Sequence, residues 1–208
     1  MIKGVLFDID GVLIDSFDAN LKFYQDLFVK AGFTPPTKED FLPLFSKTMK
    51  DVIRILTKSD TEEEIQKIWE MGKNRVVPYP IHLLHSPKNL QDIIEILHKK
   101  YFLGLVTSRI KNGVYDIPQL HNLKQYFDVV VCYEDTENHK PHPEPLLFAA
   151  KQMNISPKNL IYIGDQENDI KAAQATGMKI IIYSKTTYLT ADTCTTNFDA
   201  LPKIIEQL

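Results

Sequence analysis

The stretch IKGVLFDIDG, residues 2–11, decides the fold class of this chain. Its apolar run from Ile2 to Phe7 ends at Asp8 and is closely followed by Gly11. A run this short is typical of a buried strand, since helices usually need at least about ten residues. Four later runs of similar length and composition lie at residues 103–106, 129–132, 160–163 and 179–183. Runs that are apolar on both faces are typical of parallel strands covered by helices.

Helical patterns separate these predicted strands. Apolar residues recur at helical spacing over residues 90–97, and Ser86 followed by Pro87 predicts the start of that helix. Two more helices are predicted over residues 144–153 and 168–176. Strand and helix therefore alternate from Pro87 to the last residue. This alternation predicts an α/β fold with a doubly wound, mainly parallel Rossmann-like sheet.

The segment from Asp15 to about Tyr79 breaks the alternation. Helical patterns cover residues 17–31, 47–57 and 61–75. Thr61 and Glu64 have the spacing of a capping box at the start of the third helix. No strand pattern occurs in this segment, so we expect an all-helical insert. The predicted domains are an α/β core (catalytic) domain of residues 1–15 and 81–208 and a helical cap domain of residues 16–80.

The composition excludes several classes of function. The chain has 208 residues, of which 24 are Lys or Arg and 27 are Asp or Glu, and its net charge is -3. Without a basic surplus, neither a nucleic acid nor a membrane surface is an expected partner. No apolar stretch approaches the roughly 18 residues of a membrane span, and the two cysteines suggest no disulfide framework. We therefore expect a cytoplasmic protein, and the sequence leaves its oligomeric state open.

Polar and charged residues follow the predicted strands, at the edge where parallel sheets bind their ligands. They are Asp8 and Asp10 after the first strand, Thr107 and Ser108 after the second, Lys140 after the third, and Asp165 and Asp169 after the fourth. Two carboxylates about 6 Å apart repel each other by roughly 2.8 kcal/mol at an effective dielectric constant of about 20. The four acids therefore need a cation, and a site made of oxygen ligands favours Mg²⁺ over zinc.

Each of these features has a simpler explanation when taken alone. The Asp-x-Asp-Gly sequence could be only a turn, the Thr-Ser pair an N-cap, the lysine a solvated loop residue, and the last two acids a pair at a helix start. Arg109, directly after the Thr-Ser pair, could contact a phosphate or lie at the surface. The order of all the features along one chain favours the functional interpretation.

Four motifs make this order recognisable. They are FDIDGVLIDS at residues 7–16, VTS at 106–108, HKPHPEP at 139–145 and GDQENDI at 164–170. In sequence and in order they resemble the motifs of the haloacid dehalogenase-like hydrolases, and the resemblance covers nearly the whole chain. It is greatest to the phosphatase branch that carries a helical cap between the first and second motifs, as in phosphoglycolate phosphatases and β-phosphoglucomutases.

The resemblance implies a role for each residue that matches a motif. Asp8 would be the nucleophile that forms an aspartyl-phosphate. Asp10 would be the general acid and then the general base. Thr107 would hydrogen-bond a phosphoryl oxygen and Ser108 would help to bind the phosphate. Lys140 would neutralise the negative charge of the nucleophile and the phosphate.

The resemblance also implies a Mg²⁺ cofactor and its ligands. Asp8 and Asp165 would bind the ion directly, and Asp10 would bind it through its backbone carbonyl. Asp169 would bind it directly or support the site from outside the ligand sphere. The two alternatives for Asp169 stay open at this point.

Several functions are compatible with these motifs to different degrees. The resemblance implies hydrolysis of a small-molecule phosphomonoester, with phosphoglycolate as one candidate substrate. A phosphosugar mutase of the β-phosphoglucomutase type shares the motifs and is the alternative. Halide removal is disfavoured, because a halide leaves without the proton that Asp10 would supply. A non-catalytic phosphoacceptor domain is less favoured, because such receiver domains are roughly half this length and carry these residues in another order. A binding protein on the same fold is also less favoured, since every catalytic position is filled. Residues 45–50 of the cap lack the glycine that capped relatives often carry there, which leaves the substrate open.

Overall fold

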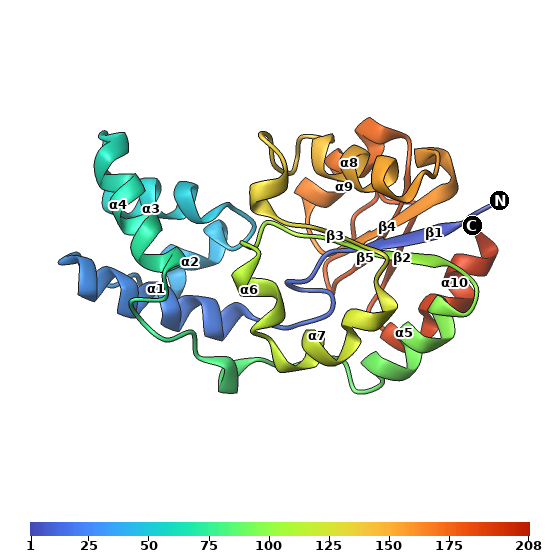
Figure 1. Cartoon of the computed structure of the whole chain (residues 1–208), viewed down its shortest axis with the longest axis horizontal. Coiled ribbons are helices and arrows are strands. Elements are labelled where there is room, and N and C mark those ends of the chain that lie inside the picture. The colour runs from blue at the N-terminus through green and yellow to red at the C-terminus, as the bar shows by residue number, and fades with distance from the viewer. The chain divides into compact units, whose positions relative to one another are not determined.

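The computed structural model describes all 208 residues, apart from the side chain of Tyr115 (Figure 1). The described chain forms two compact units. An α/β unit combines Met1–Asp15 with Ser86–Leu208, and a helical unit consists of Ser16–His85. Among the helices in the described part of the chain, none has both the length and the apolar character that a membrane span requires.

A parallel sheet forms the centre of the α/β unit. Its strands in the described chain are β1 (Gly4–Phe7), β2 (Phe102–Val106), β3 (Val129–Val131), β4 (Leu160–Gly164), β5 (Lys179–Tyr183) and β6 (Thr193–Thr195). Their order across the sheet is β3-β2-β1-β4-β5-β6, and all the pairs are parallel. Phe7, the last residue of β1, is in register with Leu105 of β2 and Ile163 of β4. The predicted doubly wound parallel sheet is confirmed.

Helices cover both faces of this sheet. They are α5 (Leu90–His98), α6 (Asn112–Tyr115), α7 (Pro118–Leu123), α8 (Glu144–Met153), α9 (Glu167–Thr176) and α10 (Leu201–Gln207). On one face, α8 packs against β2 and β3, and α9 packs against β4 and β5. On the other face, α5 packs against β2 and against α10 (Figure 1). The strands β1 and β4 are buried along their whole length, as their apolar sequences predict.

Several features of the α/β unit differ from the sequence prediction, among them the start of α5 and an additional edge strand. Helix α5 follows Asn89 rather than Ser86, because the Pro87 carbonyl belongs to a preceding turn and accepts the Leu90 N–H at 3.2 Å. The sequence does not predict β6 either. Its residues, Thr-Cys-Thr, are only partly buried at the edge of the sheet and contain no apolar run.

The helical unit contains four α-helices in its described residues. They are α1 (Phe17–Ala31), α2 (Lys38–Phe41), α3 (Met49–Thr57) and α4 (Glu62–Lys73). The core of this unit includes Leu27, Phe41, Ile53 and Trp69, which are all buried. The Tyr79 hydroxyl donates a hydrogen bond of 2.8 Å to the side chain of Asn20, which joins α1 to the last residues of the unit.

The helix starts of this unit only partly match the sequence prediction. The capping box predicted at Thr61 is wrong, because Thr61 makes no side-chain capping hydrogen bond and its hydroxyl instead lies 3.2 Å from that of Ser59. A capping box does form at the start of α2. There Thr37 and Asp40 each bond the backbone N–H of the other.

Candidate functional site

Asp8 lies at the carboxyl end of the central strand β1 and is 8% exposed. Its backbone N–H donates to the Ile163 carbonyl at 2.8 Å, so the sheet ladder continues as far as Asp8. Its Oδ1 accepts the Ile9 N–H at 2.7 Å. The neighbouring strands β2 and β4 end beside it, at the edge where the sequence predicts the site.

A tight loop follows Asp8. The Ile9 carbonyl accepts the N–H groups of Leu13 and Ile14 at 2.9 and 3.0 Å, and Gly11 has a φ of 78°. A Cβ atom built on Gly11 would lie 2.2 Å from Oδ2 of Asp165. The glycine therefore supplies both the left-handed backbone and the space that Asp165 needs.

Lys140 connects Asp8 to side chains of β4 and α9. Its Nζ donates to Asp8 Oδ2 at 2.6 Å, to Asp169 Oδ1 at 2.7 Å and to the Tyr162 hydroxyl at 2.7 Å. The side chain is 7% exposed. An ammonium group has three N–H donors, so these partners use all of them. The alternative that Lys140 is a solvated loop residue is wrong.

Asp169 organises the loop between β4 and α9. Its Oδ2 accepts the backbone N–H groups of Asp165 and Gln166, both at 3.1 Å, and it is 2% exposed. A Cβ atom on Gly164 would lie 2.4 Å from the Cβ of Asp169. Asp169 therefore caps the start of α9 and holds Lys140 at the same time.

Three carboxylates gather at this edge of the sheet. Asp8, Asp165 and Asp169 each offer an oxygen, and these oxygens lie within 4.8 Å of one another in the described part of the chain. Burial, with the charges of Asp169 and Asp8, raises the pKa of Asp165 to about 9. Burial likewise raises the pKa of Asp8 to about 7, against the opposing charge of Lys140. The single lysine thus leaves negative charge uncompensated in the cluster.

Lys140 keeps its positive charge at neutral pH. Burial alone lowers the pKa of Lys140, but the charges of Asp169 and Asp8 outweigh that effect and raise the pKa above its ordinary value. Burial, with the same two acids, also raises the pKa of Tyr162 well above its ordinary value. At neutral pH the site therefore contains the Lys140 ammonium, the neutral Tyr162 hydroxyl and several acidic side chains.

The carboxylate of Asp10 pairs with Arg109. Arg109 Nε donates to Oδ2 and Nη2 donates to Oδ1, each at 2.7 Å, while Nη1 donates to the Gly113 carbonyl at 3.2 Å. The two side chains are 22% and 11% exposed. Two parallel bonds of this kind fix the plane of a carboxylate. The surface alternative for Arg109 is wrong, and the carboxylate of Asp10 is paired separately from the other three acids.

Thr107 and Ser108 follow β2, beside this pair. Thr107 is 5% exposed, and its N–H donates to the Val131 carbonyl at 3.0 Å. Its hydroxyl accepts the Arg109 N–H at 3.2 Å. Ser108 is half-buried. The next helix, α6, begins only at Asn112, so the N-cap alternative for the two residues is wrong.

Sequence reasoning did not identify two partners in this site. The sequence leaves two interpretations of Arg109 open, and it predicts a strand at Tyr162 without indicating a role for its side chain. The signal for Tyr162 is a hydroxyl-bearing residue in an otherwise aliphatic strand, since a buried tyrosine hydroxyl needs a polar partner.

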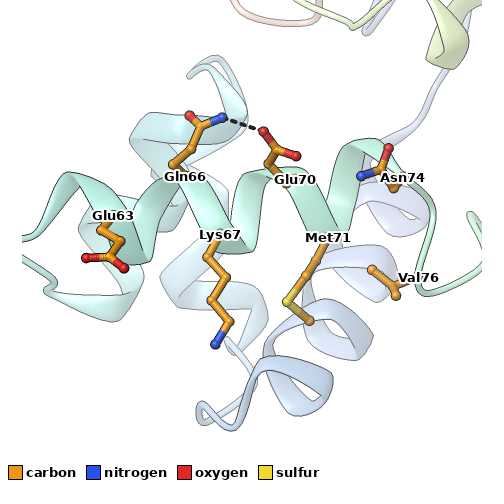
Figure 2. A pocket seen from close by; sticks show the side chains of 7 residues that line it. All are labelled: Glu63, Gln66, Lys67, Glu70, Met71, Asn74 and Val76. Atoms are coloured by element: carbon orange, nitrogen blue, oxygen red, sulfur yellow. Dashed lines mark hydrogen bonds between the residues drawn. The ribbon is translucent and has the colours of Figure 1, made fainter.

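A groove of about 480 Å³ lies on the helical unit, and its lining residues come from a different part of the chain than the residues described above. It is lined along α4 and the residues after it by Glu63, Gln66, Lys67, Glu70, Met71, Asn74 and Val76. Figure 2 shows the hydrogen bond of 2.9 Å that Gln66 donates to Glu70 along this helix. The predicted catalytic residues do not line this groove.

Comparisons with known proteins agree with this geometry. Pyrophosphatase PpaX of Bacillus cereus is 30% identical over 186 residues, which cover 89% of this chain and 84% of the relative. A solved structure from Bacteroides fragilis, named as a haloacid dehalogenase-like hydrolase, has a TM-score of 0.86 at 22% identity and covers 97% of this chain and 100% of its own. The β-phosphoglucomutase of Clostridium difficile has a TM-score of 0.82 at 21% identity, with coverage of 100% and 96%. The family model described as haloacid dehalogenase-like hydrolase matches residues 5–183, and the chain is therefore an enzyme of the haloacid dehalogenase-like hydrolase family.

Proposed function

We propose that this enzyme is a Mg²⁺-dependent phosphatase that hydrolyses a small-molecule phosphomonoester through an aspartyl-phosphate on Asp8. The observation that carries the proposal is the buried contact of 2.6 Å between Asp8 and Lys140 within a cluster of three acids. A carboxylate held in this way is an oxygen nucleophile with a fixed cation beside it, which suits attack on an anionic phosphate.

The donor set fits a magnesium ion. Asp8 and Asp165 would hold it through carboxylate oxygens, with the backbone carbonyl of Asp10 as a further ligand. Asp169 accepts two backbone N–H groups at Oδ2 and the Lys140 ammonium at Oδ1, and it is 2% exposed, whereas each oxygen of Asp8 accepts one hydrogen bond. We therefore assign Asp169 to supporting the site from outside the ligand sphere. When bound, the ion supplies positive charge that offsets the three acids and the incoming phosphate.

The proposed reaction has two steps. A carboxylate oxygen of Asp8 forms a bond to phosphorus while the bond from phosphorus to the leaving oxygen breaks, and Asp10 gives its proton to that oxygen. Asp10 then takes a proton from water, whose oxygen attacks phosphorus and breaks the bond to Asp8. Inorganic phosphate leaves and the free enzyme returns. Thr107 and Ser108 would bind phosphoryl oxygens in both steps.

Arg109 would set the position of Asp10 between the two proton transfers, and one of its two bonds to the carboxylate would open while Asp10 carries the proton. Its paired hydrogen bonds fix the carboxylate plane, and its third bond, to the Gly113 carbonyl, fixes the guanidinium. A general acid must lie within hydrogen-bond reach of the atom that it protonates. The position of Asp10 therefore depends on a residue outside the sequence motifs used to predict it.

We further propose that residues 16–85 act as a cap that favours small substrates. This helical unit is inserted directly after the loop that carries Asp10. The hydrogen bond between Tyr79 and Asn20 ties the end of the unit to its beginning, which would let it move as one body. The cap would exclude water from the reaction and obstruct a folded phosphoprotein.

The test is a phosphate-release screen with Mg²⁺ and with EDTA. The panel holds p-nitrophenyl phosphate, phosphoglycolate, sugar phosphates, pyrophosphate and a phosphorylated protein. Pyrophosphate is included because the Bacillus cereus relative is named a pyrophosphatase. We expect release from at least one small substrate, its loss in EDTA, and no release by Asp8→Asn.

Three results would contradict the proposal in different ways. Full activity in EDTA would contradict the proposed role of Mg²⁺, and activity of Asp8→Asn would mean that the nucleophile is misassigned. Conversion of a sugar phosphate to its isomer without phosphate release would favour the mutase alternative.

A further inference from the structure

Tyr162 lies among apolar residues on β4, but its hydroxyl reaches the charged groups of the site. The side chain is fully buried, in a cluster that includes Leu6 and Ile170. The hydroxyl oxygen lies 2.7 Å from Lys140 Nζ and 3.1 Å from Asp169 Oδ1. It also lies 3.3 Å from the carbonyl of Val106. Tyr162 thus connects the apolar layer under α8 and α9 to the proposed catalytic lysine.

The hydrogen bonds at this hydroxyl have a fixed direction. The Lys140 ammonium can only donate, so the Tyr162 oxygen accepts from it. The one proton of the hydroxyl then goes to Asp169 Oδ1 or to the Val106 carbonyl. Lys140 donates its other two N–H groups to Asp8 and Asp169. The ammonium is therefore oriented by three acceptors, of which only Tyr162 is neutral.

We propose that Tyr162 is a positioning residue for Lys140, an inference that rests on the proposed phosphatase function. Tyr162 and Asp169 each accept one N–H group of the ammonium. The third N–H group is therefore directed at Asp8, whose carboxylate would attack phosphorus. A neutral acceptor holds the lysine without adding negative charge to a cluster that already contains three acids. Tyr162 does not contact the reacting atoms and acts through Lys140.

The first test is Tyr162→Phe, which removes the hydroxyl and keeps the ring in the apolar cluster. One Lys140 N–H then loses its acceptor, and the ammonium can shift between Asp8 and Asp169. We expect kcat for Mg²⁺-dependent phosphate release from p-nitrophenyl phosphate to fall about tenfold, with KM changed by less than about twofold. A role in substrate binding would raise KM instead.

A matched control removes a hydroxyl from the same sheet. Tyr183 ends the next strand, β5, and its ring packs against Phe198 with centroids 5.5 Å apart. We expect Tyr183→Phe to keep the wild-type kcat. Because Tyr162 is buried and Tyr183 only partly so, Tyr162→Phe should also lower the thermal midpoint more than Tyr183→Phe. A lower midpoint together with a wild-type kcat, measured at a temperature at which both variants are folded, would overturn the proposal, because the hydroxyl would then serve stability alone.

A double-mutant cycle tests whether Tyr162 acts through Lys140. In a Lys140→Met background, adding Tyr162→Phe should lower kcat no further, because no ammonium remains to be positioned. The same tenfold loss in both backgrounds would overturn the proposal, and so would a wild-type kcat for Tyr162→Phe alone. Failure of the wild-type enzyme to release phosphate from any small ester would instead overturn the proposed function, and this inference with it.

Discussion

Two lysine–aspartate pairs in this chain have the same separation and different surroundings. In the α/β unit, Lys140 Nζ lies 2.6 Å from Asp8 Oδ2, and the side chains are 7% and 11% exposed. In the helical unit, Lys22 Nζ lies 2.6 Å from Asp26 Oδ1, and the side chains are 51% and 38% exposed. Water screens the second pair and is largely excluded from the first. Equal distances therefore describe interactions of unequal strength.

The difference teaches how to recognise a functional charge. A buried ion pair must offset the desolvation of both groups and often adds little net stability, so its burial favours the functional role proposed for Lys140. The buried lysine meets three acceptors, two of them carboxylates, whereas the exposed lysine meets one acid four residues along its helix.

Lys140→Met should have the largest effect. It removes the cation from the three acids, so an incoming phosphate would meet uncompensated negative charge. We expect kcat/KM to fall by at least about 1000-fold, measured as phosphate release at saturating Mg²⁺. A loss of less than tenfold would mean that burial of this pair does not mark catalysis.

Removal of metal should make the stability of the enzyme depend on pH. Asp8 and Asp165 have folded pKa values of about 7 and about 9, above their unfolded value of 3.8. Such raised values stabilise the fold fully below pH 3.8, and this contribution is lost as the pH rises through 7 and 9. In EDTA, the free energy of unfolding should therefore fall between pH 5 and pH 9, on the order of a few kcal/mol.

Asp165→Asn is the variant that isolates this effect. In EDTA, the free energy of unfolding of this variant should decrease less between pH 5 and pH 9 than that of the wild-type enzyme, as measured by urea unfolding at several pH values. Saturating Mg²⁺ should likewise reduce the decrease in the wild-type enzyme. Asp26→Asn, from the exposed pair, is the control and should keep the wild-type slope. The same slope for all three proteins in EDTA would contradict the assignment of the raised pKa values.

Arg109→Gln should have an intermediate effect, because Arg109 acts through Asp10 and not on the phosphate itself. The variant loses the paired hydrogen bonds that hold Asp10, so proton transfer to the leaving group should suffer more than binding. We expect kcat to fall about tenfold to a hundredfold on an ester with a poor leaving group. The loss should be smaller on p-nitrophenyl phosphate, whose leaving group hardly needs a proton. Equal losses on both substrates would contradict this role.

Lys22→Met should have the smallest effect. The pair with Asp26 is exposed on α1, so its loss should change the free energy of unfolding by less than about 0.5 kcal/mol. Phosphate release should stay at the wild-type rate. A stability loss as large as that of Lys140→Met would show that distance, rather than burial, governs both pairs.

The fold was largely predictable because it rests on strong apolar patterns. Strand β5 and helix α8 have the predicted boundaries, since each has a clear apolar pattern with well-marked ends. Strand β6 and helix α2 were missed, because three or four partly polar residues carry no period. The family prediction is confirmed, since it depends on motifs distributed over the whole chain.

The sequence predicts which residues lie at the site better than it predicts which of their side chains bond one another. The topology brings together the ends of β1, β2 and β4, so Asp8, Thr107 and Asp165 could be assigned to one edge. The partners of each side chain depend on rotamers and on distances along other elements. The bonds of Arg109 to Asp10 and of Tyr162 to Lys140 are of this kind, with sequence separations of 99 and 22 residues. A local pattern cannot specify them.

The close approach of two glycines to two aspartates has a consequence for mutational scanning. A Cβ atom at Gly11 would lie 2.2 Å from Asp165, and one at Gly164 would lie 2.4 Å from Asp169. In a library that replaces every residue and selects for turnover, both glycines should tolerate substitution as poorly as the acids beside them. A scan interpreted by chemistry alone would count them as sites without a function. They instead mark how little space separates the backbone from two aspartates, one on another loop and one on the same β4–α9 segment, and a redesign of this enzyme must keep both.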